Sequence, residues 1–356
     1  MILALAASGK MRIRTASHCA RGAICAIMGA RNGRRAETAP YGVHGIIVLD
    51  GRPCARGGLP VADIFVVLNP VAGNARPERV YPALSRYLAP GSYEVYETTG
   101  EEDLPALVRE RLAQGFDTFV AIGGDGTVGA VAAGLVGSLA RLAIVPAGTS
   151  NLLAHDAGIP ERLDDALALV VGGASIMRLD AMQLGEMYAF LNVSLGLSVG
   201  VLRDADPETK RKLGRLAYIW SGLKNLAAVG VQTVRLQVDG KPYELRASEV
   251  LVTNCPSLGA PELSLSSEIH MDDGRIEVIT FRTRHLADYW GILLDLLLRR
   301  PRQRRNVRTF EVFSQVAIET DAPAQVQVDG DLIGVTPVTV QVAPGAVRLI
   351  APRMGH

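Results

Sequence analysis

The sequence is poor in the residue types that usually identify a metal, a compartment or a charged partner. It has four cysteines and six histidines among 356 residues, 5% aromatic residues and a formal net charge of +1. The cysteines form no Cys-x-x-Cys pair and no zinc-like spacing with the scattered histidines, so we expect no structural zinc and reduced thiols in the cytoplasm. The balanced charge favours no particular partner, and we expect no nucleic acid.

No uninterrupted apolar run reaches the roughly 18 residues that indicate a membrane-spanning helix, so we expect none. The chain does have 48% hydrophobic residues, mostly aliphatic, and is long enough for two globular domains. Residues 1–60 carry nine Lys or Arg residues against two acidic ones, without a helical or strand period. We expect a mobile basic leader here. Its apolar residues precede the basic ones, which is the reverse of a secretory signal.

Residues 61–175 alternate between apolar strand segments and amphipathic helical segments. Residues 64–68 are a continuous apolar run of the buried-strand type, and Val80, Leu84 and Leu88 then share one helical face. This alternation predicts a doubly wound α/β domain with a mostly parallel sheet. In such sheets ligands bind at the carboxyl ends of the strands. The loops at this edge are residues 69–73, 98–100, 123–127 and 146–151.

The loop at residues 123–127 follows a short apolar strand, contains three glycines and Asp125, and leads into a helix of small apolar residues. A strand, a glycine-rich turn and a helix start direct backbone N–H groups at an anion. An aspartate in that turn would repel a bare phosphate, so its presence suggests a metal ion, a water network or a proton-bearing substrate group nearby. The hypothesis is a site for nucleotide phosphates with Mg²⁺. The alternative is an ordinary strand-to-helix turn whose glycines serve tight packing.

Residues 176–340 have short strand segments joined by tight turns, and we expect an antiparallel β-sandwich. The clearest turn, Asp239-Gly240, has the chemistry of a β-hairpin. We expect residues 341–356 to form a C-terminal strand or tail that returns to the first domain. The predicted strands are residues 176–184, 187–195, 233–238, 243–252, 275–281, 307–319, 325–328 and 337–342.

Two helical segments interrupt the strands, near residues 208–229 and 285–300. In the second, an apolar face is followed by a cluster of arginines between residues 299 and 308. This combination suits docking on anionic lipid headgroups. A helix packed on the β-domain with a solvated basic end also explains the pattern, and both interpretations stay open.

Five motifs in order resemble the signature blocks of the diacylglycerol kinase catalytic-domain family, which includes bacterial lipid kinases, sphingosine kinases and ceramide kinases. The resemblance runs from about residue 61 to the end. It implies a nucleotide-binding α/β domain, a β-sandwich for the lipid substrate and an active site between them. The motifs are Asn69-Pro70-Val71-Ala72-Gly73, Gly123-Gly124-Asp125-Gly126-Thr127, Pro146 to Ala154, Asp272-Asp273-Gly274 and Val328-Asp329-Gly330-Asp331.

The resemblance also implies roles for single residues. Asp273 would hold a structural Mg²⁺ with the backbone carbonyls of His270 and Arg275, and Asp331 would accept the proton. ATP would contact Asn69, Pro70, Val71, Ala72, Gly73, Thr98, Gly123, Gly124, Asp125, Gly126, Thr127, Val128, Gly129 and Thr149. Many members carry Asn-Glu where this chain has Gly129 and Ala130, and often Glu where it has Asp331.

Asp329 and Asp331 flank one glycine. In a strand, residues two apart point to the same side, although a tight turn at Gly330 would alter that. Two acids that face one site can divide the work, one orienting a metal or water and one taking a proton. We therefore expect Asp331, Asp329 and Asp125 to be the catalytic acids. For Asp239 we accept a plain hairpin turn, and we assign no role to His155.

The leading hypothesis is an ATP- and Mg²⁺-dependent lipid kinase that acts on a membrane lipid from the cytoplasm, by peripheral contact with the inner face of the membrane. Diacylglycerol, phosphatidylglycerol, sphingoid bases and ceramides stay open as acceptors, and so does a homodimer. An NAD kinase-like enzyme is one alternative, which the Asn151 to Ala154 segment and the terminal Asp-Gly-Asp oppose. A catalytically weakened, lipid-binding regulatory protein is another, because Gly129, Ala130 and Asp331 depart from the family pattern.

Overall fold

The computed structural model describes residues 63–172, 174–196, 230–266, 268–283, 291 and 306–353. The predicted basic leader lies outside the described residues, and so do the two predicted helices near residues 208–229 and 285–300, apart from residue 291. Contacts group Asp63–Ala89 and Tyr93–His356 into one compact unit, to which the strands, the helices and the site below belong.

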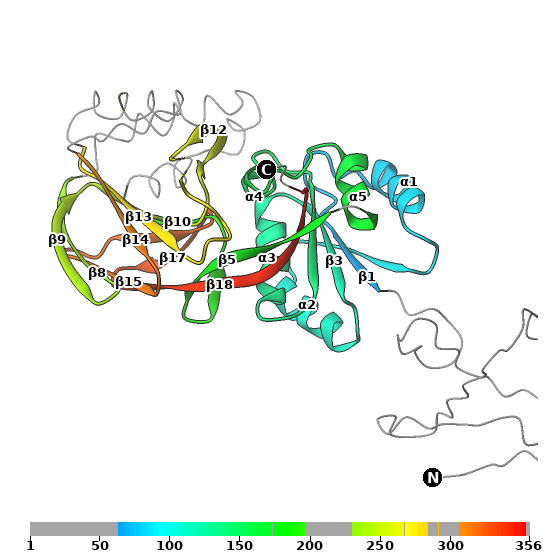
Figure 1. Ribbon diagram of the computed structural model, residues 1–356, viewed down its shortest axis with the longest axis horizontal. Coiled ribbons are helices and arrows are strands. Elements are labelled where there is room, and N and C mark those ends of the chain that lie inside the picture. Colours follow the sequence, from blue (N-terminus) through cyan, green and yellow to red (C-terminus); the bar gives the residue numbers. More distant parts are fainter. Residues whose placement is uncertain are drawn as a thin grey trace, which may run out of the picture. The chain divides into compact units, whose positions relative to one another are not determined.

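The first half of this unit is a parallel sheet with helices on both faces (Figure 1). Its strands are β1 (Ile64–Leu68), β2 (Tyr93–Glu97), β3 (Thr118–Gly123) and β4 (Arg141–Pro146). Its helices are α1 (Pro77–Tyr87), α2 (Leu104–Ala113), α3 (Asp125–Leu135), α4 (Leu152–Asp156) and α5 (Leu163–Val171). The strands lie in the order β2-β1-β3-β4, while α2 packs against α3 and α1 against α5.

β1 is central in this sheet and is almost wholly buried. Phe65, Val66, Val67 and Leu68 are inaccessible to solvent, as a strand that is covered on both faces requires. The ring of Phe65 meets that of Phe119 on β3 edge-on, with centroids 5.9 Å apart. The continuous apolar run therefore forms the core of the α/β half, and this part of the predicted fold class is confirmed.

The second half is built of antiparallel strands. One group is β5 (Ser175–Leu184), β6 (Met187–Ala189), β8 (Gln232–Val238), β9 (Lys241–Ala247), β15 (Gln315–Thr320) and β18 (Val338–Ala351). A separate six-stranded sheet has β7 (Asn192–Leu195), β10 (Glu249–Thr253), β13 (Ile276–Phe281), β14 (Val307–Val312), β16 (Gln325–Val328) and β17 (Asp331–Val335). Apolar residues of both groups, including Met182, Val250, Val316 and Val340, form one core, which confirms the predicted β-sandwich.

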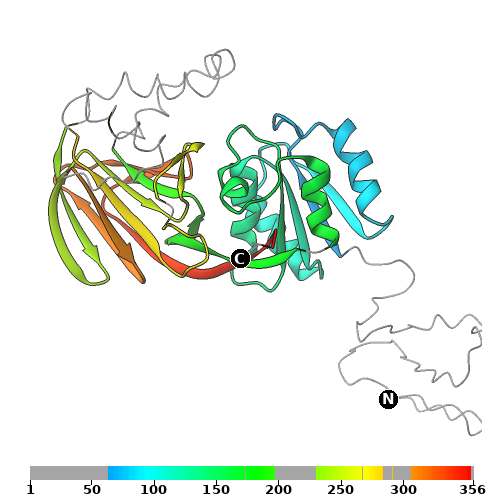
Figure 2. The ribbon, with the colours of Figure 1, turned by 45° about the horizontal axis from the view of Figure 1, so that its top comes forward.

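β18 belongs to both halves. Its first residues pair with β15, and Arg348 and Leu349 pair in parallel with Arg141 and Leu142 of β4. In between, its register with β5 shifts at residues 343–347. In Figure 2 the red ribbon of β18 runs from the antiparallel strands to the α/β strands. One ten-stranded sheet therefore contains both the parallel strands and part of the sandwich.

Three strand predictions are wrong, because each segment is two strands in the structure: residues 187–195, 243–252 and 307–319. In the first and third, the break lies where the carboxylate of a remote residue, Asp329 or Asp239, accepts successive backbone N–H groups. In the second, the hydroxyl of Ser248 donates to the carbonyl of Phe281. Hydrogen bonds with distant parts of the chain thus end strands that the local pattern continues.

Candidate active site

Three loops that each contain glycine meet at the carboxyl ends of β1, β3 and β4. A Cβ atom added to Gly148 would lie 2.5 Å from the Cα atom of Gly124, so Gly148 has no room for a side chain, and a Cβ atom at Gly124 would lie a tight 3.3 Å from the Cα atom of Gly148. The backbone N–H of Ala147 donates to the carbonyl of Gly123 (2.9 Å), and that of Asn74 donates to the carbonyl of Ala147 (3.0 Å). Three of the four loops predicted at this edge are therefore in direct contact.

The residues predicted to bind the nucleotide lie on these loops and at the neighbouring strand end. Asn69 Nδ2 donates to Thr127 Oγ1 (3.0 Å), and the N–H of Val71 donates to Asn69 Oδ1 (3.2 Å). The N–H of Thr98, after β2, donates to the carbonyl of Leu68 (2.9 Å). Of the other residues predicted to bind the nucleotide, Gly123 ends β3, Gly126, Val128 and Gly129 lie at the start of α3, and the loops contain Pro70, Ala72, Gly73, Gly124 and Thr149. Their role in binding a nucleotide stays a prediction.

Asp125 is the first residue of α3, but its carboxylate reaches the start of α4. Its Oδ1 accepts the backbone N–H of Leu153 (3.2 Å). Burial raises the pKa of Asp125, and N–H bonds from residues 151–153 partly offset this. The aspartate therefore links the glycine turn to the helix that follows the third loop, a role that the sequence did not indicate.

Asp329 is held by three successive backbone N–H groups. Its Oδ2 accepts from Phe190 (2.8 Å), and its Oδ1 accepts from Leu191 (3.0 Å) and Asn192 (2.8 Å). Asp329 is half-buried. The protein atoms around its carboxylate remove much of its hydration, and this desolvation raises the pKa of Asp329 to about 6. The N–H bonds lower the pKa and the charge of Asp125 raises it. The fold thus brings Asp125 and Asp329 within electrostatic reach of each other.

Asp331 lies in a different environment from Asp329. Asp329 and Gly330 both have positive φ, 46° and 110°, so the chain turns tightly between the two acids. Asp331 begins β17, an edge strand whose five residues are all exposed. The rule that residues two apart share a side does not hold across such a turn.

The carboxylate of Asp273, the predicted metal ligand, is bound by Arg275. Asp273 Oδ1 accepts the backbone N–H of Arg275 (3.3 Å), and Oδ2 accepts its Nε (2.8 Å). The same guanidinium also bonds Glu311. Asp180 accepts the N–H groups of Gly274 and Gly345, both at 2.6 Å.

These contacts do not fit a metal held by the Asp273 carboxylate, because a guanidinium already neutralises it. Nearby, Glu277 is 4% exposed, and burial raises its pKa to about 7; Asp273 adds to the rise and Arg275 opposes it. No group of three or more His, Cys, Asp or Glu side chains in the described part of the chain could hold a metal ion. The carbonyls of His270 and Arg275 stay predicted ligands only, and no step proposed below uses a metal there.

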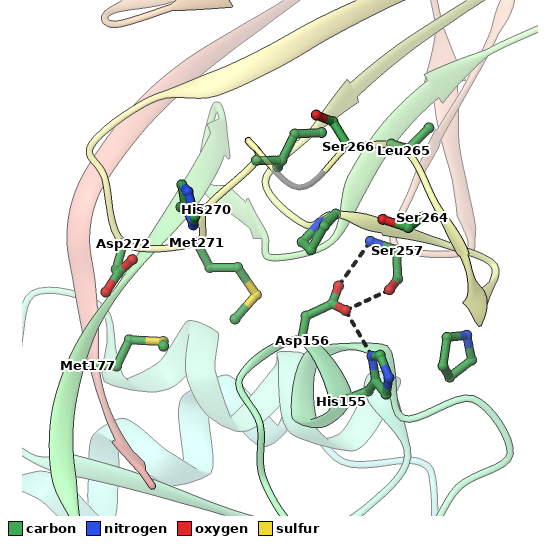
Figure 3. Close-up of a pocket in the computed structure, with 13 residues that line it drawn as sticks. His155, Asp156, Met177, Ser257, Ser264, Leu265, Ser266, His270, Met271 and Asp272 are labelled. Atoms are coloured by element: carbon green, nitrogen blue, oxygen red, sulfur yellow. Dashed lines mark hydrogen bonds and ion pairs between the residues drawn. The ribbon is translucent and has the colours of Figure 1, made fainter. Parts of the chain in front are cut away.

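Sequence reasoning missed a further acid, Asp156, whose side chain is buried at the end of α4. Its Oδ1 accepts Ser257 Oγ (2.6 Å) and pairs with His155 Nδ1 (3.0 Å), and its Oδ2 accepts the N–H of Ser257 (3.1 Å) (Figure 3). The partners Asp156 and Ser257 are 101 residues apart and lie in no common pattern, so no local signal could have revealed them.

No helix among the described residues is long and apolar enough to cross a membrane.

Comparisons with known proteins agree with this architecture. Residues 63–184 match the model of the diacylglycerol kinase catalytic domain, and residues 192–351 match that of the YegS C-terminal NAD kinase beta sandwich-like domain. A diacylglycerol kinase of Bacillus subtilis is 26% identical over 278 residues, which are 76% of this chain and 90% of that protein.

Two further comparisons cover more of the chain. An uncharacterised protein of Synechocystis sp. is 25% identical over 308 residues, 81% of this chain and 70% of that protein. A crystal structure of a diacylglycerol kinase from Bacillus anthracis str. Sterne, 22% identical, superimposes with a TM-score of 0.67 over 82% of this chain and 97% of that one, and so shares the fold.

Proposed function

As a member of the diacylglycerol kinase catalytic-domain family, this chain is a kinase, and we propose that it transfers the γ-phosphate of ATP to a hydroxyl group of a membrane lipid. The observation that carries the proposal is the direct contact of three loops around the start of α3, where the half-buried Asp125 lies within electrostatic reach of the half-buried Asp329. Asp125 comes from the glycine turn and Asp329 from the sandwich.

The loops supply the anion site. α3 begins directly after Gly124, so its unpaired N–H groups and the positive end of its dipole favour phosphate oxygens. Gly124 and Gly148 themselves place no side chain at that helix start. ATP would be the phosphoryl donor, and a Mg²⁺ ion bound with it would supply positive charge that offsets the charge of its phosphates. A carboxylate is the ligand type that Mg²⁺ prefers, and Asp125 is the one that the turn supplies.

Asp329 suits the role of proton acceptor. Three of the roughly four lone-pair positions of a carboxylate hold N–H groups, which leaves one on Oδ2 and fixes its direction. A pKa of about 6 lies close to the operating pH, as efficient general-base catalysis requires. The acceptor hydroxyl would pass its proton to Oδ2 while its oxygen attacks the γ-phosphorus, and the bond from that phosphorus to the bridging oxygen would break to release ADP. Asp331 stays the competing prediction for this role.

A membrane lipid as acceptor places the enzyme at a membrane surface, so peripheral contact with the inner face of the cytoplasmic membrane is part of the proposal. A homodimer stays a separate prediction, which sedimentation of the purified chain would test.

The test is transfer of labelled γ-phosphate from ATP to a panel of lipids in mixed micelles, with NAD as a soluble acceptor. We expect label on at least one lipid, none on NAD, and a loss of at least about 100-fold in Asp125→Asn. Label on NAD alone would support an NAD kinase-like enzyme instead. Binding of lipid without any ATP turnover would support a regulatory protein, and equal labelling by wild type and Asp125→Asn would contradict the site.

A further inference from the structure

The proposed reaction needs Asp125 and Asp329 at a fixed spacing, because phosphoryl transfer depends on reacting groups that are held in line. The two acids come from separate segments. Asp125 begins α3 after the glycine turn, while Asp329 is held by the N–H groups of residues 190–192. A continuous series of hydrogen bonds and short chain segments joins these two places. One contact in it is made by a side chain to which the proposed reaction gives no role.

The short helix α4 is the first part of this series. Its second residue, Leu153, donates its backbone N–H to Asp125 Oδ1 (3.2 Å), and its last residue is Asp156. Leu152, Leu153 and Ala154 are buried, so the helix is packed in place. The position of the glycine turn is therefore linked to the position of the Asp156 carboxylate.

Asp156 joins α4 to the hairpin of β11 (Ser257–Leu258) and β12 (Ala260–Ser264). Its side chain is 2% exposed. Its Oδ1 accepts the hydroxyl of Ser257 (2.6 Å) and its Oδ2 accepts the N–H of Ser257 (3.1 Å), as Figure 3 shows. His155 Nδ1 also lies 3.0 Å from Oδ1, but His155 belongs to α4 itself and joins no second segment. Buried hydrogen bonds to a charged group are among the strong ones, so this contact holds the hairpin against α4.

The segment directly before Ser257 continues the series toward Asp329. In residues 253–255, a hydroxyl and a backbone N–H donate to the carbonyl of Leu191 (3.1 Å each), and a thiol donates to that of Phe190 (3.3 Å). All three donor residues are at most 1% exposed, so water does not compete for these bonds. Phe190 and Leu191 donate their own N–H groups to Asp329, which closes the connection between the two acids.

From these contacts we propose that Asp156 and Ser257 are positioning residues, whose contact sets the spacing between Asp125 and Asp329. The proposal rests on the proposed lipid kinase function and adds to it a pair that acts through the two acids. A second bond between the same segments runs from the Ser150 hydroxyl to a carbonyl at the hairpin tip, but it is longer (3.4 Å) and exposed. We therefore expect it not to replace the buried contact.

The kinetic test removes the Ser257 hydroxyl. Ser257→Ala should lower kcat for lipid phosphorylation at least about tenfold, because a shift of about 1 Å between reacting groups can cost about 100-fold. KM for ATP and for the lipid should change less than about twofold, since the loss affects the transition state. Ser257→Thr keeps the hydroxyl and should restore kcat. Ser175→Ala is the matched control: it removes a partly buried hydroxyl that donates to the carbonyls of Ala351 and Pro352, and kcat should not change.

Hydrogen exchange tests the same contact without any substrate. We expect the backbone N–H groups of residues 190–192 to exchange at least about tenfold faster in Ser257→Ala than in wild type, because the segment that holds them loses its attachment to α4. Asp156→Ala removes the contact from the other side and should have the same effect, so it also serves if Ser257→Ala does not fold. Ser175→Ala should exchange like wild type. Mass spectrometry of peptides from the full chain would measure this.

The outcomes separate this proposal from the kinase function. Unchanged exchange at residues 190–192 in both variants would overturn the positioning proposal, and so would an unchanged kcat in Ser257→Ala. A raised KM for the lipid with an unchanged kcat would also overturn it, because Ser257 would then act in substrate binding. If wild type phosphorylates no lipid while exchange rises in both variants, the kinase function is wrong and the connection between the two acids is supported.

Discussion

Two Asp-Gly turns in the sandwich have the same local structure, but the pKa values of their aspartates shift in opposite directions. In each, the aspartate has a φ close to 47°, at 48° for Asp239 and 46° for Asp329, and its glycine also has positive φ. Each carboxylate accepts three successive backbone N–H groups, with Oδ2 taking the first and Oδ1 the next two. The donors are residues 313–315 for Asp239 and 190–192 for Asp329.

The difference lies in what surrounds the carboxylate. At Asp239, on the surface, desolvation raises the pKa, but the three N–H bonds and Lys241 together outweigh it, so the pKa falls below its usual value. At Asp329 desolvation is larger than the effect of the same three bonds, and Asp125 adds to it. The aspartate of such a turn by itself only holds the backbone of a neighbouring segment. Desolvation beside a second acid makes the aspartate of the second turn a candidate base.

The largest expected effect is on kcat, and it should occur at one of the two turns only. Asp329→Asn should lower kcat for lipid phosphorylation by at least about 100-fold, because it removes the proton acceptor. Asp239→Asn should change kcat by less than about twofold, because its carboxylate only holds a surface turn. Steady-state kinetics with a saturating lipid would measure both. A large loss in Asp331→Asn with little loss in Asp329→Asn would return the role of base to Asp331.

The pH dependence of stability should have opposite signs at the two turns. Asp329 has a pKa of about 6 in the folded chain against about 3.9 when unfolded, so its protonated form stabilises the fold below about pH 4 and this contribution is lost as the pH rises through 6. The effect is at most about 3 kcal/mol. Asp239, with a lowered pKa, contributes above about pH 4 and loses that contribution in more acidic solution.

Urea unfolding from pH 3 to 8 would show this. The stability difference between wild type and Asp329→Asn should change in wild type's disfavour as the pH rises from 4 to 7, and that between wild type and Asp239→Asn should change in wild type's favour as the pH rises from 3 to 5. If the two stability differences changed in the same direction as the pH rises, the contrast between the two turns would be wrong.

The smallest expected effect is a loss of unfolding free energy, and it should be equal at the two turns. Gly330 and Gly240 have φ of 110° and 79°, and a Cβ atom at either would meet no atom within 4 Å. Alanine at each should therefore cost about 1–2 kcal/mol of unfolding free energy through backbone strain alone. Only Gly330→Ala should also reduce kcat, because it moves Asp329. Equal activity in the two variants would show that the orientation of Asp329 is not critical.

The fold and the meeting of the three loops at one sheet edge could be predicted because their signals are local. Residues 64–68 and 119–122 are short apolar runs, and the loops that contain Gly124 and Gly148 each follow such a run. The arrangement of the acids could not be predicted. Asp329 differs from Asp331 because it accepts N–H groups of residues that lie 137 to 139 positions earlier in the chain. The Asp273 carboxylate is bound by the Arg275 side chain, and the sequence pattern does not indicate this contact.

The position of β18 has a consequence for how the chain is made. Its residues 338–351 pair with β4, β5 and β15, and so fill a central place in the ten-stranded sheet although they come last among the strands. During synthesis β4 therefore emerges with one edge unpaired, and that edge waits for nearly two hundred further residues. Long-range pairing of this kind folds slowly and exposes strand edges to other chains. The order of synthesis thus makes newly made α/β halves candidates for chaperone binding until the last strand arrives.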